Sequence, residues 1–178
     1  MKSLILITAA AFLFPSAAFS QSSTSLRMET KIDGKASYSD NAAKSKTQAR
    51  KLTVELTNTS DKPVGATFRW AIYGHTMKGN RLVVLKNGSQ AVKVAARETS
   101  TVTSPEVKVT GNREQTVPER KPSKNQGGKK GKPKVTFRKI PAAGEEYYGY
   151  GVEILVDGKL VGSEYSKPSI GEEMRPGG

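Results

Sequence analysis

The chain has 178 residues, and 29 Lys and Arg against 16 Asp and Glu give it a formal net charge of +13. It contains no cysteine and one histidine, which excludes disulfides, thiolate-bound metals and cysteine nucleophiles and leaves a single imidazole for acid–base chemistry. The length suits one domain, and we expect neither a cofactor nor enzymatic activity.

The first twenty residues have the pattern of a secretory signal peptide. Lys2 supplies a charged start, residues 4–14 are apolar apart from Thr8, and the small residues Ala18 and Ser20 suit a cleavage site before Gln21. The apolar run is far shorter than the ~20 residues that a membrane-spanning helix needs. We therefore predict an exported protein without a membrane span, located in the periplasm or outside a bacterial cell, where a cysteine-free chain fits best.

Alternation of apolar and polar residues predicts strands in the first part of the mature chain. Residues 36–50 hold almost no large apolar side chain and predict a loop, and Asn87-Gly88 predicts a tight turn. Asn58-Thr59-Ser60 matches an N-glycosylation acceptor and also an ordinary polar turn, and we favour the turn. The expected strands lie at 26–32, 52–57, 64–73, 81–85, 90–95, 99–104 and 106–109.

Three further strands are expected at 135–140, 147–156 and 159–165, the last two joined by the hairpin signal Asp157-Gly158. Short strands at regular spacing, with turn signals and no convincing helix, predict an all-β antiparallel sandwich, and a barrel shares the same pattern. We expect a single domain over residues 21–170, followed by a disordered tail at 171–178.

Several segments resemble small exported bacterial immunoglobulin-like domains. Residues 52–64 (LTVELTNTSDKPV) are similar to the second strand and following turn of such domains, and Trp70 stands where their third strand carries a tryptophan. Residues 94–102 resemble the turn before a later strand, and residues 147–161 (YYGYGVEILVDGKLV) resemble a terminal hairpin. The resemblance implies an immunoglobulin-like β-sandwich used for adhesion, pilus or envelope assembly or carbohydrate contact, with no catalytic residue.

Residues 111–134 are the clearest break in composition. They hold eight Lys and Arg against two Glu, a net charge of +6, and Val117 is their only large aliphatic residue. Such a segment buries too little apolar surface to offset the entropy of ordering, so we predict a flexible basic loop between hairpin strands at 107–109 and 135–137. Its lysines either attract anions or only keep the protein soluble. The candidate anion-binding residues are Arg113, Arg120, Lys121, Lys124, Lys129, Lys130, Lys132 and Lys134.

Tyr147 is the candidate aromatic contact. Strand alternation places it on the face of Gly149 and Gly151, opposite Tyr148 and Tyr150, where it forms an open shelf for a sugar or a partner. Packing within the sheet is the role we favour for it, because aromatic residues are common in strands in any case. His75 lies in a predicted turn with no acid at catalytic spacing, so we expect no catalytic role for it.

These features predict a non-enzymatic, exported binding or structural module at the bacterial cell envelope, whose partner is an envelope or pilus protein or an anionic glycan. The alternative is a binder of polyanions (anionic glycan, lipopolysaccharide or nucleic acid) that acts through the basic loop. Nucleic-acid binding would be nonspecific, because Lys and Arg match phosphates but the loop lacks aromatics on which bases stack. An exposed edge strand would allow oligomers to form.

Overall fold

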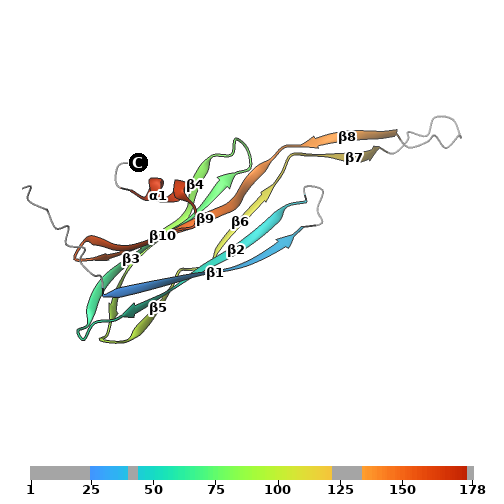
Figure 1. The fold of residues 1–178 in the computed structure, drawn as a ribbon. Helices are drawn as coiled ribbons and strands as arrows, with labels where there is room; N and C mark the ends of the chain where they lie inside the picture. The colour runs from blue at the N-terminus through green and yellow to red at the C-terminus, as the bar shows by residue number, and fades with distance from the viewer. Residues whose placement is uncertain (1–24, 40–43, 122–133, 176–178) are drawn as a thin grey trace, which may run out of the picture.

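The computed structural model describes residues 25–39, 44–121 and 134–175, so the predicted signal peptide lies outside the described residues. Within them the chain forms ten strands and one short helix (Figure 1). In chain order these are β1 (Leu26–Tyr38), β2 (Lys46–Asn58), β3 (Val64–Thr76), β4 (Leu82–Val94), β5 (Thr99–Thr103), β6 (Val107–Asn112), β7 (Gln115–Lys121), β8 (Lys134–Ile140), β9 (Ala143–Val156), β10 (Lys159–Tyr165) and α1 (Pro168–Met174).

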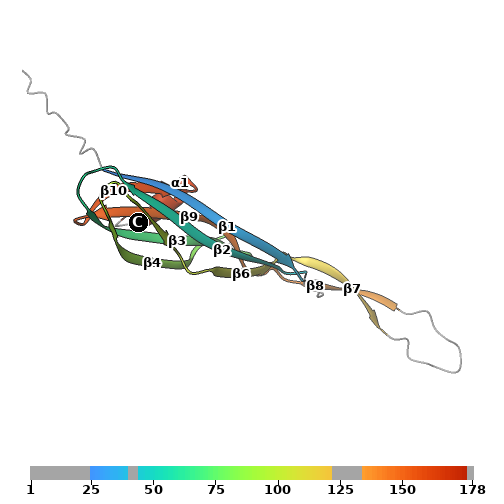
Figure 2. The same cartoon turned by 90° about the horizontal axis from the view of Figure 1, so that it is seen from below.

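Eight of these strands belong to one antiparallel sheet. Its order is β1-β2-β6-β9-β3-β4, with β10 paired to β9 and β5 paired to β2. Strands β7 and β8 form a second sheet of two strands, here called the β7–β8 ribbon, which extends away from the rest of the molecule (Figures 1 and 2). The prediction of a mostly β, antiparallel protein is confirmed.

The main core brings the apolar face of β2 against those of β3 and β9. Leu52, Val54 and Leu56 of β2 are fully buried, and they share one cluster with Phe68 of β3 and Val152 of β9. Each strand contributes every second residue, as the alternation of the sequence predicts. The large sheet therefore bends around a common hydrophobic core.

Strand β4 corrects one predicted turn. Asn87-Gly88 does not reverse the chain, because β4 runs unbroken through it and pairs with β3, where Gly88 lies opposite Trp70. A Cβ at Gly88 would come within 2.8 Å of the Trp70 indole. Because Gly88 has no side chain, the Trp70 indole can pack against the sheet there. In the sequence, the same glycine after an asparagine was interpreted as a turn.

The predicted loop at 36–50 is also shorter than expected. The β1–β2 ladder continues out to the pair Tyr38 and Lys46. Backbone hydrogen bonds extend this hairpin even though its outer part buries little apolar surface.

The basic insertion is only partly a loop. Its first part continues β6 and then forms β7, which pairs with β8 from Gln115↔Ile140 to Lys121↔Lys134. Residues 107–109 do not pair with 135–137 as expected, because β6 pairs instead with β2 and β9. The prediction of a flexible segment considered only apolar burial, whereas a backbone ladder provides order here. Residues 122–133 lie outside the described residues.

The predicted disordered tail is wrong for its first residues. Helix α1 begins with Pro168, a residue suited to the first turn of a helix, and reaches Met174. Its Ile170 is fully buried. A Cβ at Gly151 of β9 would lie 3.0 Å from Ile170 and still closer to Met174. Helix α1 therefore packs directly on the backbone of Gly151. The alternation of apolar and polar residues does not predict this contact.

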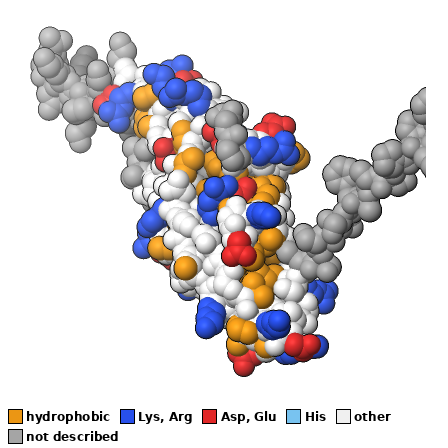
Figure 3. All heavy atoms as spheres, turned by 90° about the vertical axis from the view of Figure 1, so that its left-hand side faces the viewer, with side chains coloured by type: hydrophobic (Ala, Val, Ile, Leu, Met, Phe, Trp, Pro, Cys, Tyr) orange, Lys and Arg blue, Asp and Glu red, His pale blue; other side chains and the backbone are white. Residues whose placement is uncertain are grey.

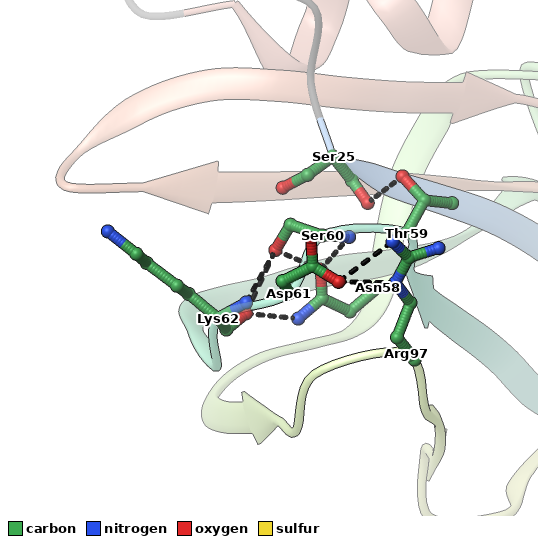
Figure 4. A network of polar contacts seen from close by, with 7 residues as sticks. All are labelled: Ser25, Asn58, Thr59, Ser60, Asp61, Lys62 and Arg97. Atoms are coloured by element: carbon green, nitrogen blue, oxygen red, sulfur yellow. Dashed lines mark hydrogen bonds and ion pairs between the residues drawn. The ribbon is translucent and has the colours of Figure 1, made fainter.

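Asn58 connects two turns at the end of the molecule opposite the ribbon (Figure 4). Its side chain is 1% exposed. Its Nδ2 donates to the carbonyl oxygens of Lys62 at 2.8 Å and Ala95 at 3.0 Å, and its Oδ1 accepts from the backbone N–H and the hydroxyl of Ser60. With its amide buried and fully bonded, Asn58 is not accessible as a glycosylation acceptor, which supports the turn interpretation.

We expect Asn58→Ala to lower the free energy of unfolding by about 2 kcal/mol or more, because it leaves buried backbone groups without partners. Asn87→Ala, at an exposed position of β4, is the matched control and should change stability by only about 0.5 kcal/mol or less. Chemical denaturation followed by circular dichroism measures both. Equal midpoints for the two variants would contradict the anchoring role of Asn58.

Candidate functional site at the base of the ribbon

Two adjoining cavities lie where the β7–β8 ribbon joins the large sheet. Their volumes are about 260 Å³ and about 500 Å³, and both are lined by Met77, Arg113 and Glu146. We call the two together the junction groove. The first is also lined by Tyr38, Lys44, Lys46, Gln48, Gly111, Gln115 and Glu145, and the second by His75, Thr76, Asn80, Tyr147, Tyr148 and Lys167.

Segments far apart in sequence meet at this groove because the ladders bring them to the same end of the sheet. The backbone N–H of Met77, in the β3–β4 turn, donates to the carbonyl oxygen of Gly144 at 2.9 Å. Gly144 has a φ of 79°, and a Cβ there would collide with the backbone of Thr110. The turn, β6 and the start of β9 are thus held in close contact, and a side chain at this glycine would separate them.

The groove is electropositive. Lys46 Nζ lies 3.0 Å from Glu146 Oε1, and Arg113 Nη2 lies 4.0 Å from Glu146 Oε2. Lys44 and Lys167 also line the groove, and neither forms an ion pair with any residue in the described ranges. Four cations therefore face two carboxylates, those of Glu145 and Glu146, which favours an anionic ligand.

Aromatic side chains form part of the second cavity. The rings of His75 and Tyr148 pack against each other with centroids 4.0 Å apart and a tilt of 30°, and Lys167 Nζ lies 3.6 Å from the Tyr148 centroid. The Tyr148 hydroxyl is within 3.0 Å of Ser169 Oγ on α1. These contacts fix the position of the Lys167 ammonium by a cation–π interaction while leaving it available to a ligand.

Tyr147 lies in the groove, but not on the predicted open shelf. Its backbone N–H donates to Gln48 Oε1 at 3.2 Å, and the Arg50 guanidinium lies 4.7 Å from its ring centroid. Burial raises the pKa of its hydroxyl, an effect that Arg50 partly offsets. Tyr147 packs against the main core cluster and contributes only part of its surface to the groove.

A β-bulge explains why Tyr147 does not share a face with Gly149 and Gly151, as uniform alternation predicted. Tyr73 pairs with Gly149 and Gly74 pairs with Tyr147, so Tyr148 is the extra residue and the alternation of faces changes there. Tyr147 and Tyr150 consequently both pack on the main core, and the predicted shelf residues Gly149 and Gly151 are covered by α1.

The structure describes four of the eight predicted anion-binding residues, and they lie in two places. Arg113 lines the junction groove. Arg120, Lys121 and Lys134 lie on the strands of the β7–β8 ribbon. The other four predicted residues are outside the described ranges, and they are Lys124, Lys129, Lys130 and Lys132.

No local pattern in the sequence links Lys44, Lys46 and Lys167, so none of the three was expected at a binding site. In the part of the chain that the structure describes, no group of three or more His, Cys, Asp or Glu is arranged to hold a metal ion. None of the described helices has the length and apolar character required to cross a membrane.

No protein-family model matches the chain, and no curated protein matches it. Among solved structures, a protein assigned as ApaA from Bordetella pertussis is 13% identical with a TM-score of 0.32, over 78% of this chain and 88% of that one. A protein from Akkermansia muciniphila is 16% identical with a TM-score of 0.30, over 79% and 72% of the two chains. The chain thus has a distant structural resemblance to bacterial β-rich proteins.

Tyr150 gives the protein an expected dependence on alkaline pH. Burial, together with a 2.7 Å hydrogen bond that its hydroxyl donates to Glu164, raises the pKa of Tyr150 to about 12. The neutral phenol is favoured in the folded state, so this stabilisation is present below pH ~10 and is lost as the pH rises through about 12.

We therefore expect Tyr150→Phe to flatten the decline of unfolding free energy between pH ~10 and ~12. Tyr38→Phe is the control, since Tyr38 is 73% exposed. Urea denaturation at a series of pH values measures both variants. A slope in Tyr150→Phe as steep as in the wild type would contradict the assignment.

Proposed function

We propose that this protein is a non-enzymatic, exported binding module of the bacterial cell envelope that binds an anionic glycan in the junction groove. The single observation that carries the proposal is the set of four cations that separate segments bring to one groove. The two-sided packing of β2 against β3 and β9 supports an immunoglobulin-like sandwich as its scaffold.

The arrangement of the cations favours a polymer over a single small anion. Lys44 lines only the first cavity, Lys167 only the second, and Arg113 lines both. A chain with repeated carboxylate or sulfate groups reaches these cations in turn, and each contact releases counterions from the polymer. The partly buried Tyr147 and the ring of His75 add apolar surface on which a sugar ring packs.

The surroundings of His75 support a binding role over a catalytic one. Its ring packs on Tyr148, and within the described ranges it has no hydrogen bond to a hydroxyl or a carboxylate. A nucleophile activated by this histidine requires such a bond.

We expect Arg113→Gln to weaken binding of heparin, used as the anionic glycan, by about tenfold at low salt and to reduce the salt dependence of the affinity. Dextran serves as the neutral polymer and should not bind.

Arg97→Gln is the matched control, because Arg97 pairs with Asp61 at the opposite end of the molecule (Figure 4). That end shows basic and acidic side chains interspersed (Figure 3). Isothermal titration calorimetry measures the affinities, and equal losses for the two variants would refute a role specific to the groove.

Glu146→Gln should act in the opposite direction. Glu146 engages Lys46 and approaches Arg113, so its carboxylate competes with any anionic ligand for both cations. We expect its neutralisation to strengthen heparin binding by about threefold or more, an effect that fades as salt rises. The same titrations measure it. Weaker binding by Glu146→Gln would indicate that the carboxylate holds the cations in place rather than competing for them.

A further inference from the structure

The β7–β8 ribbon exposes apolar side chains that the junction groove does not use. Phe137 is 73% exposed and Val135 is 49% exposed, and they are two of the five large hydrophobic residues that are exposed within the described ranges. Both belong to β8 and stand two residues apart, so they share a face of the ribbon. Pro118, also exposed, is the register partner of Phe137 and lies on this face. We call Phe137, Val135 and Pro118 the apolar ribbon face.

The strands that carry the apolar ribbon face are also rich in positive charge. Strands β7 and β8 together carry five Lys and Arg and one Glu, a net charge of +4. Lys139 follows Phe137 by two residues on the same face, where it pairs with Glu114 at 2.9 Å. Arg138, between them in sequence and so on the opposite face, is exposed and forms no ion pair within the described part of the chain. The ribbon is therefore both cationic and apolar.

The apolar ribbon face makes no contribution to the described core clusters. Phe137, Val135 and Pro118 belong to neither cluster, and the ribbon stands clear of the large sheet in both views (Figures 1 and 2). Three neighbouring apolar residues that serve no internal packing point to a partner outside the chain.

We propose that the β7–β8 ribbon docks on a lipid surface with anionic headgroups. An anionic glycan satisfies the charges of the ribbon but leaves Phe137 and Val135 in water. A bilayer interface satisfies both, because its phosphates attract the cations while apolar side chains enter the boundary with the acyl chains. Addition of a protein strand along β7 is disfavoured, since Pro118 has no N–H to donate. The ribbon thus anchors a surface-bound protein and leaves the junction groove available.

The test is co-sedimentation of the purified protein with vesicles of phosphatidylcholine and phosphatidylglycerol, compared with vesicles of phosphatidylcholine alone. We expect binding to the anionic vesicles that falls with salt, and a loss of about tenfold or more in Phe137→Ser. Leu160→Ser is the matched control, because Leu160 is also exposed, at 55%, and lies on β10, outside both the ribbon and the junction groove. The control should bind as the wild type does.

A second measurement separates insertion from adsorption by charge. Trp70 is the only tryptophan and is 5% exposed, so brominated lipids should leave its emission unchanged. We expect them to quench the added fluorescence of Phe137→Trp and not that of Val84→Trp, at a position of β4 that is 48% exposed. Unquenched Phe137→Trp emission on bound vesicles, or equal vesicle binding by Phe137→Ser and the wild type, overturns the proposal.

Self-association is the remaining outcome of the test. If sedimentation velocity without lipid shows oligomers that Phe137→Ser abolishes, the apolar ribbon face binds a second copy and the lipid proposal is wrong. Phe137→Ser should retain the thermal midpoint and the heparin affinity of the wild type, because it alters neither the core nor the junction groove. Arg113→Gln should retain insertion of the ribbon. Phe137→Ser thus tests lipid binding by the ribbon, and Arg113→Gln tests glycan binding in the groove, each without affecting the other.

Discussion

Strand β9 makes backbone ladders with three other strands, β6, β3 and β10, and the rest of the structure depends on this sharing. Its first residues close the base of the ribbon, its middle supports the core, and its last residues begin the terminal hairpin. The bulge at Tyr148 lies between the first two parts. Because the bulge changes which residues face the core, it turns Tyr147 inward and presents Tyr148 to Lys167 and α1. One extra residue therefore decides the shape of the junction groove.

The outer face of β9 illustrates how a buried charge is tolerated. The Glu153 side chain is almost fully buried, and its carboxylate accepts hydrogen bonds from the Arg69 guanidinium and, at 2.7 Å, from the Tyr165 hydroxyl. An unpaired carboxylate at this depth carries a large desolvation cost. The contacts join β3, β9 and β10 on the face that α1 partly covers. The helix and the end of β10 are thus connected to the same strand that forms the groove.

The junction groove and the β7–β8 ribbon are two different kinds of surface. The groove combines four cations with partly buried aromatic rings and two carboxylates, as suits an extended polar ligand. The ribbon combines cations with exposed apolar side chains, as suits an interface between water and a less polar phase. The two are adjacent because β6 leads into β7 and β8 leads into β9, so whatever the ribbon contacts lies close to the groove.

The sequence by itself determined the strands whose alternate residues are buried, namely those around Leu56, Phe68 and Ile154, since period-two burial is a local property. It also determined the Asp157-Gly158 turn, where both residues have the positive φ that such hairpins require. Of the groove residues it predicted Arg113 and Tyr147 as candidate ligand contacts. Only the tertiary structure decided that Gly88 accommodates Trp70, that α1 covers Gly151, and that Lys44, Lys46 and Lys167 meet at one site. These features depend on contacts between residues distant in the chain, and the register that creates those contacts leaves no local pattern.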